Sequence, residues 1–152
     1  MSTTAKTASG SMLYVSIASP ATHDQAGYEA LTWTKVGNVV SGGDLGGTIN
    51  TATYDPLDGG PTQSLPGNMT VNELTAQLAY TSSDAGQALL SSLVTIGDAN
   101  YQECVSTKFV LSTGETFYNE GFCTEYKPTP SGANDMVSAA ATFVQNYGYT
   151  VV

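Results

Sequence analysis

Short segments in which apolar and polar residues alternate recur along the chain and predict a mainly β protein. The expected strands cover residues 12–18, 33–40, 48–54, 69–80, 101–111, 115–126 and 135–145, with a short apolar tail over 149–152. About seven strands and one helix favour an antiparallel β-sandwich, or a partly open barrel, with the helix packed on it. The length of 152 residues fits one domain, residues 1–152, with one core.

The segment 69–80 has the strongest strand pattern. In its second half every other residue is apolar, and the side chains expected on the core face are Leu74, Ala76, Leu78 and Tyr80. Successive side chains of a strand point to opposite faces, so Glu73 is expected on the face away from the core.

One helix is predicted over residues 84–96. Asp84 is followed three residues later by Gln87, which is the pattern of a capping box. Gly97 is placed to end the helix in the left-handed conformation. The apolar stripe expected to face a sheet consists of Ala85, Leu89, Leu93 and Ile96, widened by Leu90 and Val94.

The segments 101–111 and 115–126 predict a hairpin around Ser112-Thr113-Gly114. A two-residue turn would place Cys104 opposite Cys123, whereas a three-residue turn with a bulge at Gly114 would shift them by one position. A disulfide is possible in the first register, but we expect reduced thiols.

Residues 41–68 interrupt the strand pattern. They contain seven glycines and three prolines, a density that predicts a long loop or an extended hairpin. A 28-residue connection is too long to be a simple link in a compact domain, so we expect it to have a function.

The charge pattern excludes several classes of protein. Thirteen acids, four lysines and no arginine give a net charge of −9, so tight binding to nucleic acid is not expected. No apolar run is long enough to span a membrane. Residues 1–10 are polar and lack the apolar core of a signal peptide.

Few residues are suited to catalysis or metal binding. The two cysteines and the single histidine, His23, do not form a metal-ligand pattern, and no cofactor is expected. His23 lies in a polar segment that predicts a solvated loop. No phosphate-binding Gly-rich loop and no GxSxG motif is present, so we expect no enzyme. A hydrolase using Glu103 and Glu120 is a weak alternative, because two carboxylates are easy to find among thirteen.

The order of these elements resembles a known family. A Trp-x-x-Val-x-x-Val strand from Trp33 precedes the Gly-rich segment, and a strand ending in Leu-x-Tyr leads to Asp84-Ala-Gly-Gln-Ala-Leu-Leu. A hairpin follows, and Gly132-Ala-Asn-Asp introduces the closing strand. From about Met12 to Gly148 the chain resembles the major tail tube proteins of long-tailed, non-contractile bacteriophages.

The resemblance implies a structural virion protein. Proteins of this family form hexameric rings that stack into a hollow tube, and the inner sheets of six subunits join into one lumen barrel. Their helix lies outside, between subunits, and their long loop contacts the next ring. The tube works with tape measure, tail terminator and tail tip proteins, is assembled in the bacterial cytoplasm, and conducts genomic DNA. The decorating C-terminal domain of many relatives is not expected here.

Residue roles follow from this resemblance. In the segment 41–68, the apolar residues expected to contact the next ring are Leu45, Ile49, Tyr54, Leu57 and Leu65. On the polar side of the helix, the residues expected to meet a neighbouring subunit are Ser91, Ser92 and Thr95. The candidates for lining the lumen are Glu73, Asp44 and Asp135. Six copies at −9 give −54 per ring, and such a wall would repel phosphate rather than hold it.

Two other readings remain open. The tube protein of a contractile tail or injection system shares the fold. A monomeric β-sandwich that binds carbohydrate or a receptor would use Trp33 and tyrosines as a platform.

Overall fold

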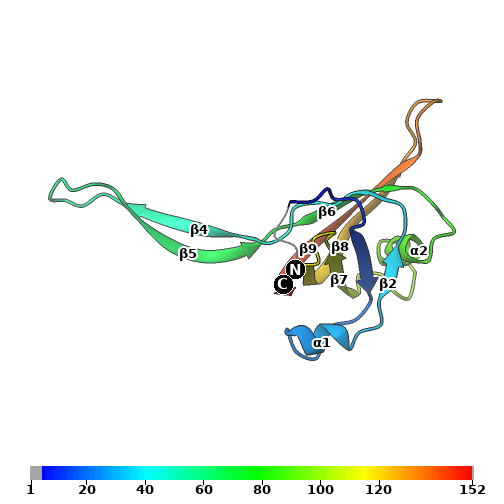
Figure 1. The fold of residues 1–152 in the computed structure, drawn as a ribbon, viewed down its shortest axis with the longest axis horizontal. Helices are drawn as coiled ribbons and strands as arrows, with labels where there is room; N and C mark the ends of the chain where they lie inside the picture. Colours follow the sequence, from blue (N-terminus) through cyan, green and yellow to red (C-terminus); the bar gives the residue numbers. More distant parts are fainter. Residues whose placement is uncertain (1–4, 152) are drawn as a thin grey trace.

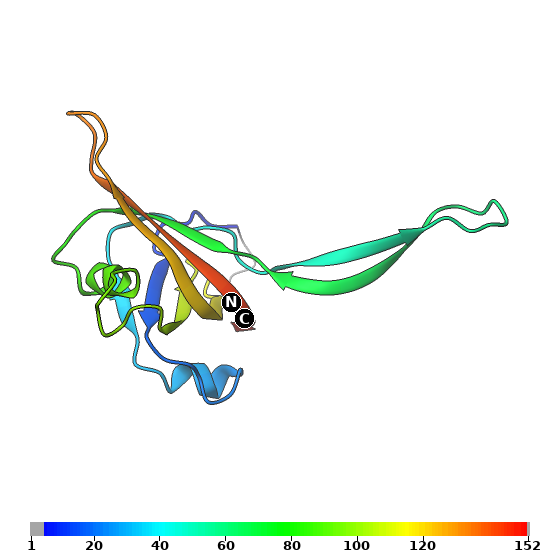
Figure 2. The same ribbon diagram turned by 180° about the vertical axis from the view of Figure 1, so that it is seen from behind.

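The computed structural model describes residues 5–151, apart from the side chains of residues 149–151. Its elements follow in the order β1 (Met12–Ser16), α1 (Gln25–Glu29), β2 (Thr34–Val36), β3 (Val39–Ser41), β4 (Gly47–Tyr54), β5 (Gln63–Val71), β6 (Leu74–Ala79), α2 (Ala85–Leu93), β7 (Cys104–Val110), β8 (Thr116–Thr129) and β9 (Ser138–Val151). Two parts are visible, a body built on one sheet and a long arm formed by β4 and β5 (Figure 1). The view from behind shows the arm projecting from the side of the body away from α2 (Figure 2).

Seven strands form one antiparallel sheet in the order β2-β1-β7-β8-β9-β6-β3. Only Gly37 and Asn38 separate β2 from β3, although these are the two edge strands. Such a short link spans roughly 10 Å, so the sheet must curl until its edges approach each other at this corner. The prediction of a mainly β fold with an antiparallel, partly open barrel of about seven strands is therefore confirmed.

The inside of the curled sheet holds the core. Leu74, Ala76 and Leu78 of β6 are buried as predicted, but Tyr80 lies beyond the strand and is exposed. The buried apolar side chains of the core are Leu13, Val15, Val36, Leu74, Ala76, Leu78, Leu90, Leu93, Val105, Phe109, Cys123, Tyr126, Ala139, Ala141 and Phe143.

Two predicted strands are each divided in the structure. The segment 33–40 breaks at Gly37-Asn38, where Asn38 has a φ of 58°. A left-handed residue turns the chain out of the extended conformation, so one predicted strand becomes β2 and β3 at opposite edges. The segment 69–80 breaks between Val71 and Leu74, where the arm joins the body.

Helix α2 begins as predicted and ends earlier. The Asp84 carboxylate accepts a hydrogen bond from the Gln87 backbone N–H at 3.0 Å, which confirms the cap. The helix ends at Leu93, and Gly97, with a φ of 93°, lies in the turn beyond it. The stripe is also rotated from the prediction, because Ala85 and Ile96 are exposed and Gly86 faces the sheet. A Cβ at Gly86 would lie 2.5 Å from the Lys35 carbonyl oxygen, so only glycine permits this close approach.

The prediction of a single helix is wrong, because α1 forms a second, short one. Asp24 caps it by accepting a hydrogen bond from the Gly27 N–H at 2.9 Å. The prediction missed α1 because five residues are too few to show helical periodicity.

The β7–β8 hairpin uses the three-residue turn. Val110 pairs with Thr116, the Gly114 N–H bonds to the Leu111 carbonyl at 3.0 Å, and Gly114 has a φ of 104°. Cys104 consequently pairs with Phe122, so Cys123 lies one position along and points to the other face. Both thiols are free.

Strand β9 is displaced relative to its prediction of 135–145. It begins at Ser138 and continues to Val151, which brings most of the expected apolar tail into the sheet. Asp135 lies before it in the β8–β9 turn, where its carboxylate accepts a hydrogen bond from the Gly132 N–H at 3.1 Å.

The segment 41–68 is mostly a twisted ribbon rather than a loop. Strands β4 and β5 pair with each other in antiparallel register from Gly47–Val71 to Tyr54–Gln63. Every residue of the two strands is exposed except Val71. Of the two alternatives the sequence left open, the extended hairpin is the correct one.

Candidate assembly surfaces

The arm exposes apolar side chains that its own body does not cover. Four of the five predicted contact residues lie on it and are exposed, namely Ile49, Tyr54, Leu57 and Leu65. Leu45 differs, because it is partly buried at the base of the arm and packs against the core. The prediction missed Met69, which is exposed opposite Ile49 in β5. The arm is therefore an unpartnered surface on an otherwise compact fold.

The apolar residues occupy both faces of the ribbon. Directly opposite residues share a face, so Ile49 and Met69 form one patch near the base. Leu65 pairs with Ala52, and Tyr54 lies two residues further along β4 on that same face. A bulge between these pairs shifts the register. A ribbon with apolar patches on both faces is suited to insertion between two neighbours.

The tip of the arm is an ordered turn. The Gly59 N–H bonds to the Pro56 carbonyl at 3.3 Å, and the Thr62 hydroxyl bonds to the Asp55 carboxylate at 2.5 Å. Gly59 has a φ of 81°, a conformation that favours glycine. This turn leaves the Leu57 side chain fully in solvent.

The predicted helix contacts are less free than the sequence indicates. The Ser92 hydroxyl donates to the Leu89 carbonyl at 2.6 Å, and the Thr95 hydroxyl donates to the Ser91 carbonyl at 2.7 Å. Ser91 and Ser92 are also partly buried, whereas Thr95 is exposed. Of the three, Thr95 has the most accessible side chain for a neighbouring subunit.

The three acidic candidates do not lie together. Glu73 is exposed directly before β6, as predicted from the alternation. Asp44 follows Gly43, whose Cα packs so closely on the Thr75 backbone that a Cβ would lie 2.6 Å from it. Asp44 and Glu73 thus both lie at the base of the arm. Asp135 belongs to the β8–β9 turn, which projects from a different corner of the body (Figure 1).

A polar cluster gathers around Glu120 of β8. Its carboxylate accepts hydrogen bonds from the Ser19 hydroxyl and from the Cys104 thiol, the latter at 3.3 Å, and pairs with the His23 ring. Burial acts to raise the pKa of Glu120, but these hydrogen bonds outweigh it and hold the pKa below its usual value. His23 also stacks on Tyr147, with ring centroids 4.1 Å apart. His23 lies in a loop and is exposed, as predicted, but its ring pairs with Glu120 and stacks on Tyr147, contacts that the sequence does not indicate.

The Cys104 thiol of this cluster is not activated as a nucleophile. Burial, the hydrogen bond to Glu120 and its charge raise the pKa of the Cys104 thiol, whereas a nucleophilic cysteine needs a lowered one. Among residues 5–151 no group of three or more His, Cys, Asp or Glu side chains is placed to hold a metal ion. Neither helix in that range has the length and apolar character needed to cross a membrane.

Trp33 is held within an aromatic cluster rather than displayed. Its indole N–H donates to the Tyr28 carbonyl at 3.0 Å, and its ring lies 6.0 Å from that of Tyr118. Tyr28 is completely buried and stacks on Tyr118 at 5.1 Å. A tryptophan fixed in this way packs α1 onto the sheet, which argues against the sugar platform considered from the sequence.

Two buried side chains, Tyr28 and Cys123, have raised pKa values, so the folded chain is expected to lose stability at high pH. Burial, with the charges of Glu120 and Cys104 adding to it, raises the pKa of Tyr28 to about 12, and burial raises the pKa of Cys123 to about 11. Both groups are neutral below these values, so their stabilisation is complete below pH 9 and is lost as pH rises toward 12. Each tenfold change in proton affinity corresponds to about 1.4 kcal/mol, so Cys123 alone accounts for roughly 2–3 kcal/mol above pH 11.

Urea unfolding at a series of pH values tests this expectation. The free energy of unfolding should be level from pH 7 to 9 and then fall. Cys123→Ala should flatten the part of the curve between pH 9 and 11. A profile that stays level to pH 12 would contradict the assignment.

The fold is shared with parts of contractile injection systems. A chain of the six-fold symmetrised baseplate of the anti-feeding prophage superposes with a TM-score of 0.69 at 7% identity, over 99% of this chain and 97% of that chain. A chain of the sheath/tube terminator of the extracellular contractile injection system PVC, in its extended state, gives 0.65 at 12% identity, over 98% of both chains. A chain of the PVC sheath–tube complex in its extended state superposes with a TM-score of 0.59 at 13% identity, over 93% of this chain and 88% of that chain.

These likenesses establish a common fold across nearly the whole chain. No protein-family model and no curated protein sequence matches the chain.

Proposed function

We propose that this chain is a structural, non-enzymatic protein of a tail-like tube, in which copies form six-fold rings that stack through the arm. The observation that carries the proposal is the arm, a fully exposed ribbon with apolar patches on both faces, attached to a body whose fold matches injection-system chains over nearly their full length. Exposed apolar area of this kind marks an interface, so we expect another molecule to cover the arm.

A contractile tail or injection system is the preferred setting. The neighbours described above come from contractile systems, although the sequence pattern resembles the tubes of non-contractile phages. In either setting the partners are further copies of the chain, together with the proteins that start, measure and end the tube. The particle carrying the tube is the proposed location.

Electron microscopy of the purified chain tests the proposal. Negative-stain images of concentrated protein should show rings or tubes. Assembly should increase with salt, because each copy carries a charge of −9 and salt screens the repulsion between copies. A chain that stays monomeric at high concentration and high salt would overturn the proposal.

The exposed face of β6 at the base of the arm is the proposed lumen wall. Glu73 and Asp44 lie there, and Thr75 and Gln77 continue this outward face with uncharged polar side chains. A wall of acids and small polar groups repels phosphate and holds duplex DNA weakly. Asp135 lies elsewhere in the body, so we do not assign it to this wall.

Charge reversal at Glu73 tests the wall. Glu73→Lys should leave assembly intact, because the side chain is exposed, and should make the tubes retain short duplex DNA at low salt. Particles carrying this variant should deliver DNA poorly. Glu29→Lys, with the same charge change at exposed α1, is the matched control. Equal DNA retention by both variants, or by neither, would contradict the assignment of this face.

A further inference from the structure

The tip of the arm presents one apolar side chain on a preformed turn. Leu57 is fully exposed, and the turn that carries it is fixed by hydrogen bonds within residues 55–62. Pro56 precedes it and limits the freedom that docking would remove. A rigid turn with a projecting leucine is shaped to enter a hollow on another molecule.

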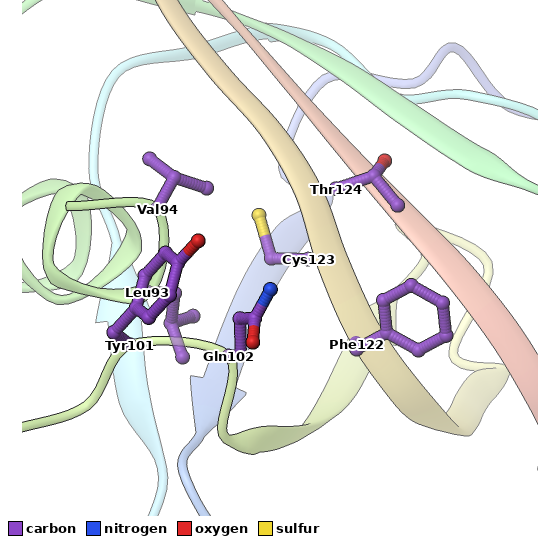
Figure 3. Close-up of a pocket in the computed structure, with 7 residues that line it drawn as sticks. All are labelled: Leu93, Val94, Tyr101, Gln102, Phe122, Cys123 and Thr124. Atoms are coloured by element: carbon purple, nitrogen blue, oxygen red, sulfur yellow. The ribbon is translucent and has the colours of Figure 1, made fainter. Parts of the chain in front are cut away.

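A hollow of about 500 Å³ lies where α2 ends beside β8. Leu93 and Val94 come from the end of α2, Tyr101 and Gln102 from the following loop, and Cys123 from β8 (Figure 3). Cys123 points toward the end of α2, whereas Phe122 and Thr124 point to the other side of the strand. Of the side chains that the structure describes, no charged one lines this hollow, although 17 of the 152 residues are Asp, Glu or Lys.

The hollow and the arm lie at opposite ends of the molecule. In both views α2 is at the end of the body away from the arm (Figures 1 and 2). The arm therefore cannot reach the hollow of its own chain. A projecting group and a receiving hollow at opposite ends give a head-to-tail contact, which repeats without limit along a stack.

We propose that the hollow between α2 and β8 receives the Leu57 tip of a second copy of this chain. The uncharged lining matches an uncharged side chain, and the contact leaves the donor's hollow and the acceptor's arm free for the next copies. This inference rests on the proposed stacking function and names its receiving surface. A smaller hollow of about 240 Å³ at the base of the arm, lined in part by Val40 and Leu45, is the competing location.

The two locations can be separated by disulfide trapping in the full chain. In a Cys104→Ser, Cys123→Ser background, Leu57→Cys is combined either with Gln102→Cys, in the hollow beside α2, or with Val40→Cys, in the hollow at the arm base. Gln102 and Val40 are both exposed, so the added thiols should be tolerated, and because Cys123 belongs to the core, circular dichroism of the background first verifies that it folds. Assembled samples are oxidised with copper–phenanthroline and separated on non-reducing gels.

The Gln102 pair should yield at least about tenfold more crosslinked chain than the Val40 pair. The reason is that docking of the tip in the hollow raises the effective concentration of the two thiols. Equal crosslinking, or an excess from the Val40 pair, in samples that form tubes would overturn the inference while leaving the stacking function intact. Absence of tubes from the parent chain at high concentration and high salt would instead overturn the stacking function. If Leu57→Cys alone blocks assembly, Asp58→Cys supplies the tip thiol and the same comparison decides.

Discussion

Shortening the arm is expected to abolish assembly and to leave the body folded. Ile49 and Met69 lie directly opposite each other, so an Asn-Gly turn can join them in place of residues 50–68. Every residue removed is exposed except Pro56, which is partly buried, and the removed segment contributes no residue to the core. The variant should therefore show unchanged thermal unfolding of the body, within about 0.5 kcal/mol, while rings and tubes disappear from electron micrographs.

A control variant tests whether assembly tolerates changes on the arm that leave its apolar side chains in place. Thr51→Ala with Thr53→Ala changes two exposed polar residues of β4 and keeps Leu57, Leu65 and Met69. This control should assemble like the parent chain. Tubes of normal length formed by the shortened variant would show that the arm is dispensable and would refute its role in stacking.

The second large effect is expected at Gln87, where Gln87→Ala should cost roughly 3–4 kcal/mol of stability. This side chain is 1% exposed. Its oxygen accepts hydrogen bonds from the Thr81 N–H at 2.9 Å and the Tyr126 hydroxyl at 3.1 Å. Its nitrogen donates to the Gly37 and Ala79 carbonyls at 3.0 and 2.9 Å. Removing the amide leaves several buried polar groups without a partner, and each such loss costs about 1–3 kcal/mol.

Urea unfolding followed by circular dichroism measures this loss. Gln77 is an exposed glutamine of β6, so Gln77→Ala is the control and should change stability by less than about 0.5 kcal/mol. A loss below about 1 kcal/mol for Gln87→Ala would show that this network does not hold α2 against the Gly37 corner and the end of β6.

The sequence predicts the elements that one local pattern determines. Alternation places Leu74, Ala76 and Leu78 in the core, and the Asp84 cap places the start of α2. The capping-box pattern at Gln87 is only half realised, because its side chain bonds to Gly37, Ala79, Thr81 and Tyr126 instead of returning to the Asp84 N–H. That choice depends on where β2, β6 and β8 meet, which no local pattern contains.

The predictions that failed share one cause. The break at Gly37-Asn38 lies between two short β-forming segments, and only the closure of the sheet requires it. The strand predicted over residues 48–54 is confirmed as β4, but β5 is predicted only from residue 69 onward, because it has no buried face before Val71 and so lacks the alternation that identifies a strand. A tube axis is set by the packing of neighbouring copies. The periodicity of one chain shows only which face of that chain a residue lies on, so it does not place Asp44, Glu73 and Asp135 relative to the axis.

The strand lengths have a consequence for handling the free chain. Unpaired strand edges are templates for uncontrolled pairing between molecules. In the body, the edge strands β2 and β3 have three residues each, which is too short to template much growth. The arm strands have eight and nine residues, and in the part of the chain that the structure describes each pairs with no strand but the other. Amyloid-type aggregation of stored protein should therefore begin at the arm, and the shortened variant should remain clear in solution for longer.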